Sequence, residues 1–218
     1  ANATSGVTVT WNSVYGAQKY TVYRKTYNDT TKAWSSWETL TSNCTTTSYT
    51  DSKALVGVKY KYTVRACNDS VKSSYKASAN IIYLAQPTVT VKAVSNGVNV
   101  NWTQCAGSKG YTVYRAEYNT TTKQWSSWKN MGTAKKEKKA WVDKSAKKGV
   151  QYKYTVKAVN GKTASAYKSS SSLLYLAQPT VKISNADTGV KVSWTKATGA
   201  TGYRVYIYIF KTFCSIFI

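Results

Sequence analysis

The sequence predicts an all-β protein built from tandem β-sandwiches, and three observations support that fold class. First, the chain repeats itself about every 91 residues: VTVTW at residues 7–11 returns as VNVNW at 98–102 and as VKVSW at 190–194. Second, apolar and polar residues alternate in these segments, which is the pattern of a strand with one buried face. Third, Thr, Tyr and Val dominate, and no segment of useful length has a helical period. A repeat of about 90 residues is the size of a small domain rather than of a solenoid repeat.

The 218 residues accommodate two complete units and part of a third, with boundaries expected at residues 1–85, 86–177 and 178–218. Because Ala1 aligns with Lys92, we expect unit one to lack its first strand and the chain to be a piece of a longer protein. After Tyr206 the third unit departs from the repeat and becomes apolar. That run is shorter than the roughly 20 residues that span a bilayer, so we expect an aberrant partial unit and no transmembrane segment.

Each further predicted strand occurs at matching positions of the first two units, and this recurrence is the reason for expecting six or seven short strands per unit. The matching segments are YTVYR (20–24 and 111–115), WSSW (34–37 and 125–128), YKYTV (60–64 and 152–156), and IIYL or LLYL (81–84 and 173–176). In residues 60–66 the Tyr, Val and Ala side chains should face the core, and Lys, Thr and Arg should face solvent. Both closing segments run into Gln-Pro, where the next unit opens.

These units resemble fibronectin type III domains. The resemblance lies in the strand-end tryptophans Trp11, Trp102 and Trp194, in the Tyr-x-Val-Tyr-Arg strand, and in a sixth strand led by Tyr60 or Tyr152. It implies an immunoglobulin-like sandwich with those tryptophans in the core, and with both tyrosine hydroxyls bonded back to the preceding turn. The double-Trp segment is typical of such domains in exported proteins of Gram-positive bacteria, so the resemblance implies a secreted or cell-surface protein.

Catalysis is not expected. The chain contains no His, and only Asp51 and Asp143 recur between units among its eight acidic residues. A turn-stabilising side-chain bond explains that recurrence, so we predict no enzyme activity, no cofactor and no metal site. The cysteines, Cys44, Cys67, Cys105 and Cys214, stand at non-equivalent positions, which argues against a repeated disulfide framework; a single bridge between Cys44 and Cys67 stays open.

The candidate binding residues are aromatic and basic. Two tryptophans three residues apart on a strand should point to opposite faces, which leaves one of each pair partly exposed. An exposed ring either stacks on a sugar or, as we favour, covers cross-strand neighbours. On the solvent face of the same sheet we expect basic side chains over tyrosine rings, either as a self-contained ladder or as a site for an acidic glycan or protein. The residues are Trp34, Trp37, Trp125 and Trp128, with Tyr23, Lys25, Lys61 and Arg65 in unit one and Tyr114, Lys153 and Lys157 in unit two.

The formal net charge of +23 attracts polyanions without choosing among them. Four lysines cluster in unit two, namely Lys135, Lys136, Lys138 and Lys139. No nucleic-acid-binding motif accompanies them, so a specific nucleic-acid partner is not expected. We therefore expect a non-catalytic spacer and adhesion module whose partner is a protein, an anionic glycan or a cell-wall polymer. The alternatives are a secreted ligand of a host receptor and a carbohydrate-binding accessory domain of a secreted glycoside hydrolase.

Overall fold

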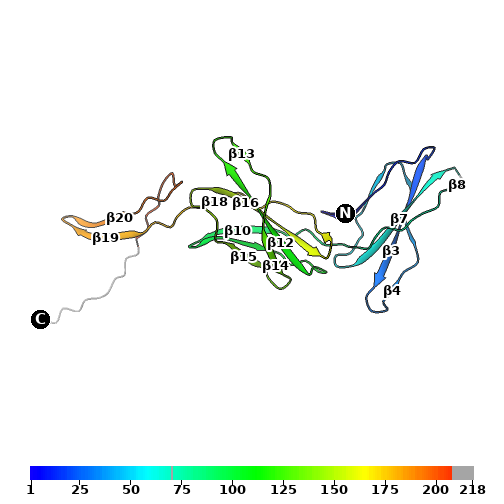
Figure 1. The fold of residues 1–218 in the computed structure, drawn as a ribbon. Helices are drawn as coiled ribbons and strands as arrows, with labels where there is room; N and C mark the ends of the chain where they lie inside the picture. Colours follow the sequence, from blue (N-terminus) through cyan, green and yellow to red (C-terminus); the bar gives the residue numbers. More distant parts are fainter. Residues whose placement is uncertain (70, 208–218) are drawn as a thin grey trace.

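The structure is a computed structural model that describes residues 1–69 and 71–207. Its regular elements are β-strands, and they follow the sequence repeats from unit one to unit three (Figure 1). The strands of unit one are β1 (Asn2–Ala3), β2 (Gly6–Thr10), β3 (Lys19–Asn28), β4 (Ala33–Trp34), β5 (Glu38–Cys44), β6 (Ser48–Asp51), β7 (Lys59–Asn68), β8 (Val71–Lys72) and β9 (Ile81–Ile82). The all-β prediction is confirmed.

Unit two repeats this order, and the described part of unit three begins it again. The strands of unit two are β10 (Val89–Val94), β11 (Gly97–Trp102), β12 (Gly110–Asn119), β13 (Gln124–Trp125), β14 (Lys129–Lys135), β15 (Ala140–Asp143), β16 (Gln151–Asn160), β17 (Thr163–Ala164) and β18 (Leu173–Leu174). Those of unit three are β19 (Val181–Ala186) and β20 (Gly189–Trp194). The apolar run predicted after Tyr206 lies, beyond Ile207, outside the described residues.

Two antiparallel sheets form each of the first two units. One sheet has the order β1-β2-β6 in unit one and β10-β11-β15 in unit two. The other has the order β4-β3-β7-β8, with β5 beside β3 and β9 beside β7, and unit two repeats it as β13-β12-β16-β17, with β14 and β18 in the matching places. The longest pairings, β3 with β7 and β12 with β16, form the centre of the second sheet.

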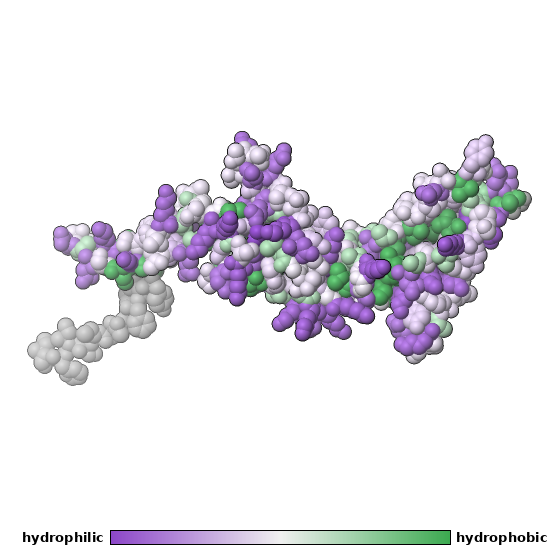
Figure 2. Space-filling view, viewed as in Figure 1, coloured by the Kyte–Doolittle hydropathy of each residue, from purple (hydrophilic) through white to green (hydrophobic). Residues whose placement is uncertain are grey.

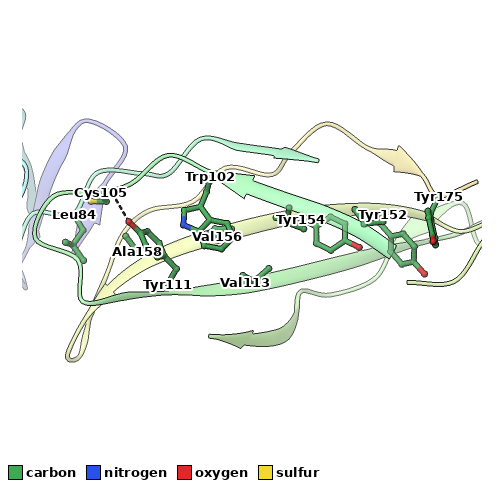
Figure 3. Packing of buried hydrophobic residues seen from close by; sticks show 12 residues of the cluster. Leu84, Trp102, Cys105, Tyr111, Val113, Tyr152, Tyr154, Val156, Ala158 and Tyr175 are labelled. Carbon is green, nitrogen blue, oxygen red and sulfur yellow. Dashed lines mark hydrogen bonds between the residues drawn. The ribbon is translucent and has the colours of Figure 1, made fainter. Parts of the chain in front are cut away.

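Strand alternation builds the core of unit two. Tyr111 pairs with Ala158 and Val113 with Val156, so these four side chains share the inner face, and each is at most 1% exposed. The first sheet covers them from the other side, and Trp102 packs its ring 5.4 Å from that of Tyr111 (Figure 3). Burial of each large apolar side chain stabilises the fold by about 1.5–3 kcal/mol. The predicted core position of Trp102 is confirmed.

The prediction for the other two strand-end tryptophans is met only in part. Trp11 is half-buried and packs edge-on against Tyr20, with ring centroids 5.4 Å apart. Trp194 was expected in a core, but its exposed fraction is 38%. The reason is that β19 and β20 form a two-stranded sheet, and the described residues of unit three provide no second sheet to cover it.

Successive units meet through a pair of glycines. A Cβ atom on Gly107 would lie 2.6 Å from the Cα of Gly57, and the backbone at Gly107 has a φ of +77°, which favours glycine. The next joint repeats this approach, because a Cβ on Gly199 would lie 3.2 Å from the Cα of Gly149. Leu84 of the first joint is fully buried against the core of unit two. The two joints therefore use the same close backbone contact.

Candidate functional site

The outer surface of the second sheet carries alternating aromatic and basic side chains in unit one. The β3–β7 register places Lys25 opposite Lys61 and Tyr23 opposite Thr63 on the face that points away from the core. Arg65 lies on the same face, opposite Thr21. We call this surface the aromatic–basic face. Its aromatic members in unit one are Tyr23, Tyr27, Trp34, Trp37 and Tyr75.

Cations lie over four of these rings. The ammonium of Lys61 is 4.9 Å from the ring centroid of Trp34, and that of Lys25 is 5.0 Å from the ring centroid of Trp37. Lys59 lies 4.1 Å from the ring of Tyr27 and Arg65 lies 5.9 Å from that of Tyr75. Tyr27 packs against Trp34 with tilted rings, and Trp37 packs edge-on against Tyr75. Each cation–π contact contributes about 0.5–1 kcal/mol at an exposed site.

The expectation that the paired tryptophans point to opposite faces is wrong. Strand β4 ends at Trp34, so the two-residue alternation does not continue to Trp37. Ser35 accepts a hydrogen bond from the backbone N–H of Thr26 through its hydroxyl and thereby turns the chain. Both tryptophans consequently lie on the aromatic–basic face, under Lys61 and Lys25, and both are half-buried.

Unit two reproduces this surface with different members. Lys153 lies 4.4 Å from the ring centroid of Trp125, and Lys157 lies 5.6 Å from the ring of Tyr114 and 4.7 Å from that of Tyr167. The ring of Tyr167 is also 6.0 Å from that of Trp128, in an edge-on arrangement. The contact between Tyr118 and Trp125 matches that between Tyr27 and Trp34.

A buried ionic network, which the sequence reasoning missed, lies between the two sheets of each unit: an aspartate of the first sheet meets an arginine and a tyrosine of the second. In unit two, Oδ2 of Asp143 accepts hydrogen bonds from Nη1 of Arg115 at 2.7 Å and from the hydroxyl of Tyr154 at 2.9 Å. In unit one, Asp51 binds Arg24 at 2.9 Å and Tyr62 at 2.8 Å. Each aspartate is 1% exposed. A signal was available, because all three residue types occupy matching positions in the two units.

The predicted turn-stabilising role of the aspartates is also observed. Oδ1 of Asp143 accepts from the backbone N–H of Ser145 at 2.9 Å, and Oδ1 of Asp51 accepts from that of Lys53 at 3.2 Å. Burial alone raises the pKa of Asp143, but hydrogen bonds from Ser145, Arg115 and Tyr154 outweigh it and hold that pKa below its usual value. Burial and the neighbouring carboxylates raise the pKa of both tyrosines, Tyr62 and Tyr154.

The second carboxylate of the network changes its position between units. Arg24 donates from Nη2 to Glu38 of β5 at 2.8 Å, whereas Arg115 donates to Glu117, two residues further along its own strand. The position equivalent to Glu38 in unit two is Lys129. The charge balance around the arginine is therefore kept although the carboxylate comes from a different strand.

The predicted tyrosine corners are present. The hydroxyl of Tyr60 accepts a hydrogen bond from the backbone N–H of Leu55 at 2.7 Å, and that of Tyr152 accepts from Lys147 at 2.8 Å. Both rings are at most 2% exposed.

The lysine cluster lies at the end of β14 and in the turn that follows, and Lys135, Lys136, Lys138 and Lys139 are all exposed. Among residues 1–69 and 71–207 the ion pairs are those of Arg24 and Arg115, with Glu38, Asp51, Glu117 and Asp143. Arg24 and Arg115 thus form ion pairs with four of the eight acidic residues of the chain. The clustered lysines have no carboxylate partner within the described part, and their positive charge faces solvent.

The cysteines that the structure describes are free thiols. Cys44 lies on β5 opposite Tyr20 of β3, and Cys67 lies on β7 opposite Lys19 of β3. The two cysteines therefore flank β3 on opposite sides. Strands two places apart in a sheet are separated by roughly 9–10 Å, which exceeds the Cα separation of a disulfide. A bridge between Cys44 and Cys67 is therefore incompatible with this sheet, and the fourth cysteine lies outside the described residues.

Two further observations concern the described residues. They contain no helix long and apolar enough to cross a membrane. In residues 1–69 and 71–207 no three or more Cys, Asp or Glu side chains are placed together as metal ligands.

The strand order and the tyrosine corner place the first two units in the class of immunoglobulin-like β-sandwiches. Residues 1–81 match the family model described as the fibronectin type III domain, SaeA third domain. Unit one is a fibronectin type III domain, and unit two is a fibronectin type III-like sandwich with the same strand order. Domains of this family are typically non-catalytic, and they commonly mediate protein binding.

Three solved structures are similar to the chain. A two fibronectin type III domain segment from chicken tenascin is 16% identical, covers 77% of this chain and 90% of its own, and has a TM-score of 0.39. The FN1–FN3 domains of chicken CNTN1 are 17% identical, with 80% and 64% covered and a TM-score of 0.35. The alpha chain of the chicken interferon gamma receptor is 12% identical, with 77% and 91% covered and a TM-score of 0.36. No curated protein matches the sequence. The family match and the strand order support the assignment, and these structures add nothing to it.

Proposed function

We propose that the chain is a non-catalytic spacer and binding module of a secreted or cell-surface protein, with an anionic envelope polymer or glycan as its partner. The proposal includes the division into domains at residues 1–85, 86–177 and 178–218, and an origin in an exported protein of a Gram-positive bacterium. The observation that supports it is the unpaired charge of the lysine cluster. Hydrophilic residues cover much of unit two in Figure 2.

The aromatic–basic face favours an anionic partner over a neutral sugar. A sugar that stacks on tryptophan needs an open ring face, but lysine ammonium groups already lie over Trp34, Trp37 and Trp125. The same lysines retain unpaired positive charge, which an anionic polymer would neutralise. The geometry therefore gives the carbohydrate-binding accessory role no specific support, and nothing observed favours a host receptor.

The test is a binding assay on purified cell walls that either carry or lack their phosphate polymer. Exposed charges are screened by salt, so binding should fall steeply between about 50 and about 500 mM NaCl. A variant with Lys135, Lys136, Lys138 and Lys139 changed to Ser should lose most of the binding. Its control changes four dispersed exposed lysines, Lys53, Lys72, Lys76 and Lys162, and lowers the net charge equally. Equal loss in both variants would mean that binding depends on net charge alone and not on the lysine cluster. Binding that is unaffected by salt and by removal of the phosphate polymer would contradict the proposal.

A further inference from the structure

Two lysines face each other across the central strands of unit one. The β3–β7 register places Lys25 directly opposite Lys61, and both side chains lie on the aromatic–basic face. Lys61 lies 4.9 Å from the ring centroid of Trp34, and Lys25 lies 5.0 Å from that of Trp37. Side chains that are directly opposite in a sheet have their Cβ atoms only about 4.5–5.5 Å apart. The sheet therefore anchors two cationic side chains at neighbouring positions, each against a tryptophan ring.

This pair of charges is unfavourable by itself, because like charges directly opposite each other destabilise a sheet. Among the residues that the structure describes, the ion pairs belong to Arg24 and Arg115, so neither lysine has a carboxylate that offsets the other. Both lysines are half-buried, which limits the screening of their charges by solvent and salt. The ring contacts offset part of the repulsion. An anionic group bound between the two ammonium groups would remove the rest.

Unit two shows that the ring contacts do not require the second lysine. There, Lys153 takes the place of Lys61 and lies 4.4 Å from the ring centroid of Trp125, which matches Trp34. The residue opposite Lys153 is Ala116, which takes the place of Lys25. The tryptophan and the first lysine thus recur between the units, whereas the second lysine is specific to unit one. A purely structural role explains the first lysine and leaves the second without a reason.

We propose that Lys25 and Lys61 form a binding site for a phosphate monoester. A phosphate monoester carries nearly two negative charges and three acceptor oxygens, so each ammonium can donate to a different oxygen and both charges are balanced. A carboxylate brings a single charge and leaves one ammonium uncompensated. The inference rests on the proposed function for the source of the ligand, and it deepens that function by naming the charged group of the partner. The site is distinct from the lysine cluster of unit two.

The experiment is a titration of the full chain with inorganic phosphate at constant ionic strength, followed by the indole N–H NMR signals of Trp34 and Trp37. Both signals should shift saturably, because binding draws the two ammonium groups away from the rings. Acetate should bind at least about tenfold more weakly, since it offers one charge for two. Glucose 6-phosphate should bind at least as tightly as inorganic phosphate. Tighter binding of the sugar phosphate would identify a phosphate carried on a glycan, and equal binding would identify the phosphate group alone.

Two substitutions at matching positions test whether both lysines are needed. Lys61→Ala should weaken phosphate binding, measured at Trp37, at least about tenfold, because one of two charged donors is lost. Lys153→Ala is the matched control: it removes the equivalent lysine from above Trp125 in unit two, where no lysine stands opposite. Phosphate binding of this variant, again measured at Trp37, should stay within about twofold of wild type.

A third variant should build the site in unit two. Ala116→Lys places a lysine opposite Lys153, as Lys25 stands opposite Lys61, and should add a saturable phosphate response at the indole signal of Trp125. Ala116 is only 3% exposed, so the melting temperature of the variant is measured alongside. A variant that melts like wild type and shows no response at Trp125 would count against the proposal.

The variant with Lys135, Lys136, Lys138 and Lys139 changed to Ser separates this site from the proposed function. It should lose cell-wall binding and keep the phosphate response of Trp34 and Trp37. The proposal is overturned if these two signals do not shift with phosphate, if Lys61→Ala and Lys153→Ala bind phosphate alike, or if acetate binds as tightly as phosphate. Cell-wall binding that persists in the absence of a phosphate response would overturn the site and leave the proposed function intact.

Discussion

Removal of the Asp143 carboxylate should strongly destabilise unit two. Its two oxygens accept four hydrogen bonds, from Arg115, Tyr154 and both the backbone and the hydroxyl of Ser145. Asp143→Ala leaves Arg115, which is 6% exposed, and a fully buried Tyr154 hydroxyl without this partner. Removing one partner of a buried ion pair costs about 3–5 kcal/mol, and leaving a buried hydroxyl unsatisfied costs about 1–3 kcal/mol.

These costs overlap, because they arise in one network and because Arg115 keeps its contact with Glu117. We therefore expect a loss of about 3–4 kcal/mol from a unit whose total stability is roughly 5–14 kcal/mol. For a unit of this size each kcal/mol shifts the melting temperature by about 4–8 °C, so the midpoint should fall by about 12–32 °C. Scanning calorimetry of the full chain measures this shift.

A compensated variant separates the network from simple loss of packing. Arg115→Met, Asp143→Leu and Tyr154→Phe together replace the buried polar groups by apolar side chains of similar size, a change that is often neutral for a buried ion pair. The triple variant should lose less stability than Asp143→Ala alone. A fall of less than about 5 °C for Asp143→Ala, or a triple variant as unstable as the sum of its parts, would refute the reasoning.

Three other outcomes are expected. Gly107→Ala should loosen the joint between units one and two and broaden the distance distribution in small-angle scattering. The control, Gly16→Ala, has nearly the same φ but open space around a Cβ, so its distribution should not change. Identical distributions for the two variants would contradict the glycine contact at the joint. Because the pKa of Asp143 is lowered in the folded state, its contribution to stability is complete above the usual carboxyl pKa of about 3.9 and is lost as pH falls through the lowered value. Melting temperatures from about pH 6 to about pH 2 should therefore drop at the acid end, and less so in Asp143→Ala. Lys153→Met, which removes an ammonium from above a tryptophan ring, should cost about 0.5–1 kcal/mol in denaturant unfolding, while the exposed Lys148→Met should cost nothing measurable.

The sequence predicted the fold well because the repeat displays each strand more than once. The alternation in residues 60–66 correctly placed Tyr60 and Tyr62 inward and Lys61 and Arg65 outward. Alternation is a local property of an extended chain, so it can be read from one segment alone. The tyrosine corner, in contrast, was expected from the resemblance to fibronectin type III domains and not from the alternation itself.

The failures arose where a contact depends on chain that is distant in sequence. Trp37 was misplaced because the sequence does not show that β4 ends at Trp34. Trp194 was assigned to a core, but burial requires a facing sheet and not only an apolar pattern on one strand. The link between Arg115 and Asp143 spans 28 residues of sequence, so neither residue alone indicates the network.

The glycine pair at each joint has a consequence for any longer array of these units. Because Gly57 meets Gly107 as Gly149 meets Gly199, each unit is placed on the preceding one by the same backbone contact. Identical steps repeated along a chain trace a helical path of constant pitch, in which length grows in proportion to the number of units. An aromatic–basic face would then recur at regular intervals along such an array. This regular spacing requires glycine at each joint, because a Cβ there would clash with the neighbouring unit.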